Sequence, residues 1–428
     1  MQEASLLPLR PADMLFSAFL GALFAALDTE RVRFCVLRNY EGFPDINIGG
    51  DIDLLISQSD LPKAVRALRS VDGVRIVGFS ERSWVAHAFV ESVSATPEAR
   101  SMQVDFLWNL SWKGLAYVPT DVLLESAVAR TAGNLRFLVP SPVHEAITSL
   151  FASLLKSAWL KEKYFPGVQE TFTEHRLEVI SVLMPQFGRK NAEHLVKAVM
   201  AGDRSRMVGL VRPLRRALAV RSLSHKPIRS CIEVLRHYVR EIIVRFCPAS
   251  VETVCLIGLD QSRVAKLIED LVPTLQYAAK AVESFKIDSE SPSSRTPARP
   301  FASRMNIVRM LVRAWQRQFL GKKELTLRIC AGSYDDLVID PKRLQYAGPA
   351  WFAKTACALF PSPMLWILLD SREDASQGSD AYRALVTAKP RHAILDAVLP
   401  EARVVEAAYA AVVGTLALRT GKILDNRF

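Results

Sequence analysis

The sequence predicts an α/β fold in three parts. These are an N-terminal α/β domain at 1–145, a basic helical domain or connector at 146–250, and a C-terminal domain at 251–428 built on a parallel sheet. The length of 428 residues exceeds that of one ordinary domain. Apolar strand-like runs alternate with helical patterns at both ends of the chain, and helical signals fill the middle.

The N-terminal elements follow from apolar runs and the residues that bound them. In the strand at 51–56, acids alternate with apolar residues before the run becomes fully apolar, as in a strand that enters a core. The predicted elements are a helix at 14–27, a strand at 33–37, a glycine- and proline-containing loop at 38–50, the strand at 51–56, a helix at 61–71 and a strand at 102–108.

The rest of the chain begins with helical patterns from 142 to 246, interrupted by prolines. A strand at 253–257 then ends at Gly258 and precedes a helix at 262–275. Beyond these, the composition predicts a flexible loop at 288–299, strands at 325–330 and 364–370, and a final helix at 404–418. Strand and helix alternate in this last third, which predicts a parallel sheet.

Cysteine usage and hydropathy indicate the compartment. The six cysteines are scattered without a CxxC pair, which argues against a zinc site and favours a reducing cytoplasm. The longest apolar run, at 14–27, is shorter than the ~18–20 residues that cross a bilayer. We therefore expect a cytoplasmic protein without a membrane span.

Positive charge is concentrated in the middle of the chain. The formal net charge is +11, but residues 1–150 carry −4 and residues 151–250 carry +10. Residues 204–245 hold 11 Lys and Arg and two acids, with an apolar stripe that includes Leu235 and Val239. Such a segment fits either a solvated face between two domains, which is the simpler interpretation, or peripheral contact with an anionic inner membrane. No nucleic-acid module is recognisable, so nucleic acid is not favoured as a partner.

Three acids form the candidate catalytic and metal site. Asp51 and Asp53 are two residues apart on a strand, so their side chains leave the same face, and Asp105 on a second strand can join them. Converging carboxylates suit Mg²⁺ ions that bridge a triphosphate. Gly49 and Gly50, directly before, allow a phosphate to approach the backbone. The alternative is a set of solvated acids on an exposed strand.

These residues carry a resemblance. The runs VLRNYEGFP at 36–44, GGDIDLL at 49–55 and QVDF at 103–106 resemble the nucleotidyltransferase-fold proteins of bacterial surface-polysaccharide gene clusters. The resemblance implies that Asp51, Asp53 and Asp105 bind Mg²⁺ and that an NTP is the substrate. The Gly-Ser pair of that superfamily is missing, and Arg38 is the candidate phosphate contact in its place. Lys156, Lys161 and Lys163 are further phosphate candidates or, alternatively, solvated helix lysines.

The C-terminal part resembles a thymidylate kinase-like P-loop domain with a degenerate loop. The segment GLDQSRVAK at 258–266 keeps Gly258 and Asp260 of the phosphate loop, and the runs at 334–349 and 361–370 resemble later segments of that family. A working loop needs glycines, a lysine and a hydroxyl on Mg²⁺. Gln261 and Arg263 stand at glycine positions, and Val264 stands at the lysine position. Lys266 is the remaining candidate for a phosphate contact.

Three functions are compatible with these features. The first is a Mg²⁺-dependent nucleotidyltransferase that acts on a small sugar or lipid-linked acceptor in surface-polysaccharide or related cell-envelope biosynthesis, with the kinase-like domain as a scaffold. The second is a non-catalytic nucleotide-binding or regulatory protein in which both nucleotide sites have decayed. The third is a residual thymidylate kinase-like phosphotransferase. The sequence favours the first.

Overall fold

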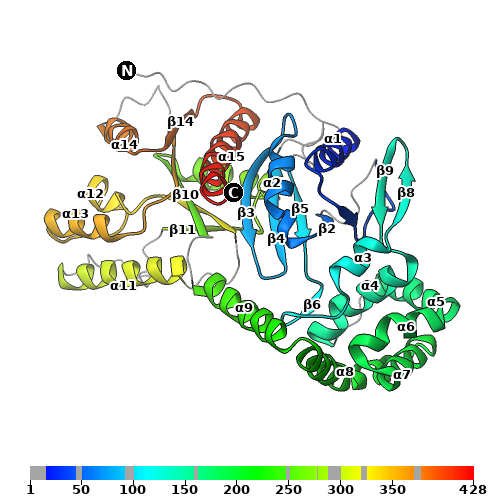
Figure 1. The fold of residues 1–428 in the computed structure, drawn as a ribbon. Helices are drawn as coiled ribbons and strands as arrows, with labels where there is room; N and C mark the ends of the chain where they lie inside the picture. Colours follow the sequence, from blue (N-terminus) through cyan, green and yellow to red (C-terminus); the bar gives the residue numbers. More distant parts are fainter. Residues whose placement is uncertain are drawn as a thin grey trace.

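A computed structural model of the protein describes residues 16–44, 51–91, 101–158, 162–246, 251–276, 278–287, 300–319, 325–370 and 377–428 (Figure 1). Within these ranges the chain is a mixed α/β protein, as the sequence predicts, with two five-stranded sheets and two small two-stranded ones. Gly49, Gly50, Lys161 and the loop predicted at 288–299 lie outside the described residues.

The first sheet has the strand order β1-β2-β5-β4-β3. β2 and β5 run parallel, and the other neighbouring pairs are antiparallel. The strands predicted at 33–37, 51–56 and 102–108 are present in it, whereas β3 and β4 were not predicted. The bounds are β1 (Phe34–Val36), β2 (Asp51–Ile56), β3 (Arg75–Glu81), β4 (Val85–Glu91) and β5 (Ser101–Leu107).

The two faces of this sheet differ because successive side chains of a strand alternate between them. One face packs against the helices α1 (Phe16–Thr29) and α2 (Leu61–Arg69) in one apolar core. On the other face, Leu55, Val85 and Leu107 pack against the helical middle of the chain. Val77 and Phe89 on the same face pack against the C-terminal part. This second face is therefore covered at two places by later segments of the chain.

The segments after the first sheet lead into the helical region. They are the 3-10 helix η1 (Gln58–Asp60), the hairpin strands β6 (Ser111–Trp112) and β7 (Leu115–Ala116), α3 (Thr120–Glu125), and the hairpin strands β8 (Val128–Ala132) and β9 (Leu135–Val139). The helices predicted between 142 and 246 are confirmed. They are α4 (Pro142–Ser157), η3 (Glu162–Tyr164), α5 (Phe165–Glu174), α6 (Arg176–Phe187), α7 (Arg189–Met200), α8 (Arg204–His225) and α9 (Pro227–Phe246).

The second sheet is parallel throughout, with the order β11-β12-β10-β13-β14, as the alternation of strands and helices predicts. Its central strand β10 alternates between two cores: Val254 and Leu256 face α10 and α15, while Cys255 and Ile257 face α11, α13 and α14. The bounds are β10 (Val251–Gly258), α10 (Gln261–Thr274), β11 (Ala281–Lys286), α11 (Pro300–Phe319), β12 (Thr326–Ala331), α12 (Asp336–Ile339), α13 (Ala350–Leu359), β13 (Leu365–Asp370), α14 (Gln377–Thr387), β14 (His392–Asp396) and α15 (Glu401–Asp425).

The last helix, α15, joins the two sheets. Figure 1 shows it between the second sheet and β3 of the first. Its residue Thr420 donates a hydrogen bond to the carbonyl of Val77 at 3.0 Å. Further along, Leu424 is buried in the core of the first sheet together with α1 and α2. The chain after residue 251 is thus packed onto the N-terminal part through apolar contacts.

α15 is also the one helix among the described residues that is long and apolar enough to cross a bilayer by length and composition alone. Of its most apolar window, 44% is buried inside the protein. Tyr409, Val412 and Leu416 lie in the core that it shares with α10 and the second sheet. Packing in that core accounts for part of the apolar composition of this helix.

The position of Leu424 makes a stability prediction. Leu424→Ala should lower the free energy of unfolding by about 2–5 kcal/mol, because it leaves a cavity in the core of the first sheet. Leu418→Ala on the same helix, where the side chain is 67% exposed, should change it by less than about 0.5 kcal/mol. Urea denaturation followed by circular dichroism measures both. Equal effects of the two substitutions would contradict the packing of α15 onto the first sheet.

Candidate functional site

A strip of polar side chains, which we name the acidic strip, crosses the second face of the first sheet. Asp51 and Asp53 come from β2, Gln103 and Asp105 from β5, and His87 from β4. The register places Asp53 opposite Asp105, and Asp105 opposite His87. Because alternate residues of these strands belong to the α1–α2 core, the strip lies on the face that the helical middle and the C-terminal part flank.

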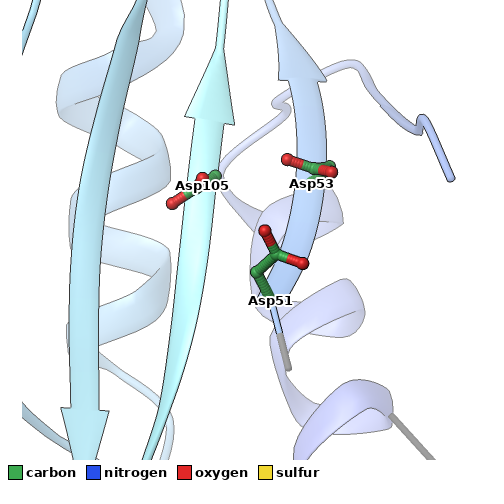
Figure 2. A group of neighbouring side chains, drawn as sticks. All are labelled: Asp51, Asp53 and Asp105. Carbon is green, nitrogen blue, oxygen red and sulfur yellow. The ribbon is translucent and has the colours of Figure 1, made fainter. Parts of the chain in front are cut away.

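The three acids predicted from the sequence lie together in this strip (Figure 2). One carboxylate oxygen of each of Asp51, Asp53 and Asp105 lies within 4.8 Å of those of the other two. Asp53 and Asp105 are buried, with 1% and 6% of their surface exposed, and Asp51 is half-buried. Carboxylate oxygens at this spacing are the hard ligands that Mg²⁺ prefers. The donor set therefore fits a divalent cation.

Each buried carboxylate has a partner that uses one of its oxygens. The Arg38 Nε donates to Oδ2 of Asp53. His87 Nδ1 lies 2.7 Å from Oδ1 of Asp105, and the Gln103 side-chain amide donates to the same oxygen at 2.7 Å. These contacts hold both carboxylates in fixed orientations and involve only one oxygen of each. The second oxygen of each carboxylate is not used by Arg38, His87 or Gln103.

The electrostatics follow from burying three acids together. Burial, and then the charges of Asp53 and Asp105, raise the pKa of Asp51 to about 6. Burial also opposes the charge of Arg38, but the adjacent Asp53 carboxylate outweighs it, so the pKa of Arg38 is raised above its usual value. Negative charge has thus accumulated in a poorly solvated site, where a cation is favoured.

Arg38 lies between the acids and a cavity. Besides touching Asp53, it lines a cavity of about 200 Å³ between the end of the first sheet and α4. Trp84 and Tyr117 supply aromatic walls, and Asn109 and Thr148 supply polar groups. Asn39, the next residue after Arg38, has φ 62°, a left-handed conformation that Asn tolerates better than most residues. Its side-chain oxygen accepts a hydrogen bond from Tyr164 at 3.0 Å.

The predicted lysines are placed around this cavity in different ways. Lys156 lines it, with Nζ 3.9 Å from the centroid of the Trp84 ring. The Nζ of Lys163 lies 3.5 Å from the side-chain oxygen of Asn39. Lys161, Gly49 and Gly50 fall outside the described residues. Lys156 is thus the candidate that shares a cavity with Arg38.

In the predicted phosphate loop of the C-terminal part, the side chains of Asp260 and Gln261 form hydrogen bonds to the backbone of the loop itself. Asp260 caps α10, accepting hydrogen bonds from the backbone N–H groups of Ser262 and Arg263, at 2.9 and 3.2 Å. Gln261 donates to the carbonyl of Gly258 at 2.6 Å and accepts from Arg343 at 2.6 Å. The Nζ of Lys266 lies 2.6 Å from Glu401, and both side chains are exposed. The donors that a phosphate would use at this helix end are engaged by the protein itself.

Sequence reasoning missed His87, Gln103 and Trp84. Gln103 precedes Asp105 by two residues, so strand alternation alone places it on the same face. His87 and Trp84 belong to β4 and the turn before it, and that strand was not predicted. A single His in an apolar run does not indicate a functional site by itself. Only the pairing of β4 with β5 places His87 beside Asp105.

The raised pKa of Asp51 makes a prediction for the metal-free protein. At pH 8 in EDTA, Asp51→Asn should raise the melting temperature by a few degrees, because it removes an ionised carboxylate from the cluster. The folded state of the wild type holds a proton on Asp51 between pH 4 and 6 that the unfolded state has lost. Its stability therefore falls as the pH rises over this range, and the advantage of Asp51→Asn should shrink towards pH 4.

Differential scanning calorimetry at the two pH values measures this advantage. An Asp51→Asn variant that melts below the wild type at pH 8 would show that the carboxylate is not destabilised by its neighbours.

No protein-family model matches the chain, and no curated protein matches it in sequence.

Proposed function

We propose that the protein is a Mg²⁺-dependent nucleotidyltransferase whose site is the Asp51, Asp53 and Asp105 cluster. The observation that carries the proposal is the convergence of three carboxylates on the inner strands of one sheet, with oxygens within 4.8 Å of one another. Two of them are buried and oriented by Arg38, His87 and Gln103. Such an arrangement costs free energy without a cation, which favours a functional role over solvated strand acids.

The chemistry of the site follows from its ligands. Asp51, Asp53 and Asp105 would hold the cation, which when bound supplies positive charge to a triphosphate and to an attacking hydroxyl. His87 and Gln103 hold one carboxylate oxygen of Asp105. Arg38 neutralises Asp53 and offers a guanidinium to phosphate oxygens, for which its planar fork is suited.

The cavity beside Arg38 is the candidate place for the second substrate. At about 200 Å³ it accommodates a small group, and its aromatic wall with neighbouring amide and hydroxyl groups suits a sugar ring or a nucleobase. Because Arg38 lines the cavity and contacts Asp53, a group bound there would lie near the acids. A small sugar or lipid-linked sugar in surface-polysaccharide or related cell-envelope biosynthesis is the acceptor that the sequence resemblance suggests, in a cytoplasmic setting.

The C-terminal part has a scaffolding role in this proposal. Its loop at 258–266 is held by Asp260, Gln261 and Arg343, and Lys266 pairs with Glu401. The same part packs on the first sheet next to the acidic strip, through Val77 and Phe89. It would therefore stabilise the nucleotidyltransferase site without transferring phosphate.

The alternative function is that of a nucleotide-binding or regulatory protein without catalysis. The contact between Arg38 and Asp53 favours it, because a guanidinium on a buried carboxylate competes with a cation for that ligand. A third possibility is a residual phosphotransferase that uses Lys266.

The proposal predicts Mg²⁺-dependent NTP binding at the first sheet. Isothermal titration of the full-length protein with the four ribonucleoside triphosphates should show binding in Mg²⁺ that EDTA abolishes. Asp51→Ala combined with Asp53→Ala should weaken binding by at least roughly tenfold, because the cation loses two of its three carboxylate ligands.

Two matched variants serve as controls. Asp72→Ala combined with Glu125→Ala removes two exposed acids from the same part of the chain and should leave binding unchanged. Lys266→Ala should also leave it unchanged. Binding that survives the loss of Asp51 and Asp53 but is abolished by Lys266→Ala would reject the proposal in favour of a live C-terminal site.

A further inference from the structure

Helix α9 has its apolar side turned outward. Five apolar residues, spaced alternately four and three apart, lie on one side of it and are 44–76% exposed. They are Ile228 (76%), Ile232 (55%), Leu235 (64%), Val239 (44%) and Ile242 (55%), and Ile243 (42%) lies beside them. We name these six residues the α9 stripe. A helix at a protein surface ordinarily buries such a stripe and exposes its polar side.

The polar side of α9 instead contacts the N-terminal part. Arg240 donates to the carbonyl of Glu81 at 2.9 Å, and His237 lies 2.9 Å from the Ser83 hydroxyl. Glu241 pairs with Arg82 at 3.6 Å. These contacts fix the rotation of the helix, so the α9 stripe is held toward solvent by the fold.

Helix α11 repeats this pattern. Its exposed apolar residues have the same spacing of four and three, and Arg304 and Arg309 are exposed beside them. They are Phe301 (75%), Met305 (41%), Val308 (41%), Val312 (49%) and Trp315 (40%), which we name the α11 stripe. α11 contains four Arg and no acid between 300 and 319. In Figure 1 both α9 and α11 lie along the lower margin of the molecule.

The charges beside the stripes indicate what covers them. On α9, Arg229 and Arg236 are exposed next to the stripe, and Arg236 also donates to the Gln58 side chain at 3.2 Å. The two acids of α9, Glu233 and Glu241, are half-buried on the other side. A second copy of the chain, paired stripe to stripe, would bring arginines together without the acids that normally accompany a helical seam. An anionic lipid surface complements an apolar stripe with a basic rim.

Two arginines of α8 contact backbone carbonyls of the helical region. Arg215 donates to the carbonyl of Leu155 at 2.8 Å, and Arg221 donates to that of Pro185 at 3.3 Å. Both therefore tie α8 to the helical region. Two of the basic residues of 204–245 thus serve internal contacts of α8, whereas Arg229 and Arg236 of α9 lie at the rim of an exposed apolar stripe.

We propose that the α9 and α11 stripes bind the surface of an anionic phospholipid bilayer, with the apolar side chains among the acyl chains and the arginines at the headgroups. This attachment is peripheral and does not use α15. It is independent of the metal site, so the Asp51→Ala and Asp53→Ala variant should retain it.

Vesicle co-sedimentation of the full-length protein tests this attachment. The wild type should bind vesicles that contain phosphatidylglycerol, bind phosphatidylcholine vesicles much less, and lose binding as salt is raised. Leu235→Asp on α9 should weaken binding by roughly tenfold or more, since a carboxylate then enters the apolar contact and opposes the headgroup charge. Val312→Asp should act in the same way on α11.

The matched control is Leu177→Asp on α6, where the leucine is 81% exposed and outside both stripes. It should bind like the wild type and melt at a temperature similar to those of the stripe variants. Equal binding to neutral vesicles, or no binding to either kind, would overturn the proposal. So would a dimer in light scattering that Leu235→Asp converts to a monomer, because a second copy would then cover the α9 stripe.

Discussion

The structure depends on one constraint, the strict alternation of side chains on β2, β4 and β5 of the first sheet. It sends one set of residues into the α1–α2 core and leaves the other set on a single face. That face carries apolar residues at two places, where the helical middle and the C-terminal part pack. The acidic strip lies on the same face. The packing that assembles the protein also removes water from Asp53 and Asp105. Because these two carboxylates have lost water, they need hydrogen-bond partners within the protein. Arg38, His87 and Gln103 are those partners.

Arg38 connects this constraint to the proposed chemistry. Its guanidinium contacts Asp53, and its side chain lines the cavity between the first sheet and α4. A ligand in that cavity and a cation on the acids would therefore both act on the same arginine. The C-terminal part contributes by packing, since the helix-end donors of its loop are engaged by Asp260.

Local patterns in the sequence predicted much of this, and nonlocal pairing accounts for what they missed. Asp51, Asp53 and Asp105 could be found because each lies in a strand with a clear apolar pattern. His87 could not be found, since its role depends on β4 pairing with β5, and β4 was not predicted. The positions in 258–266 that differ from a working phosphate loop could be named from the sequence, but the cap formed by Asp260 depends on three-dimensional contacts. The apolar period of α9 predicted a helix correctly, yet periodicity does not tell whether a stripe faces a core or solvent.

The central claim is that the three carboxylates form a divalent-cation site. Electron paramagnetic resonance of Mn²⁺ titrated into the full-length protein tests it without assuming a substrate. We expect a bound Mn²⁺ spectrum that Asp105→Asn removes and that substitution of the exposed Asp121 by Asn preserves. A spectrum of free Mn²⁺ with the wild type, in the presence and in the absence of NTP, would contradict the claim.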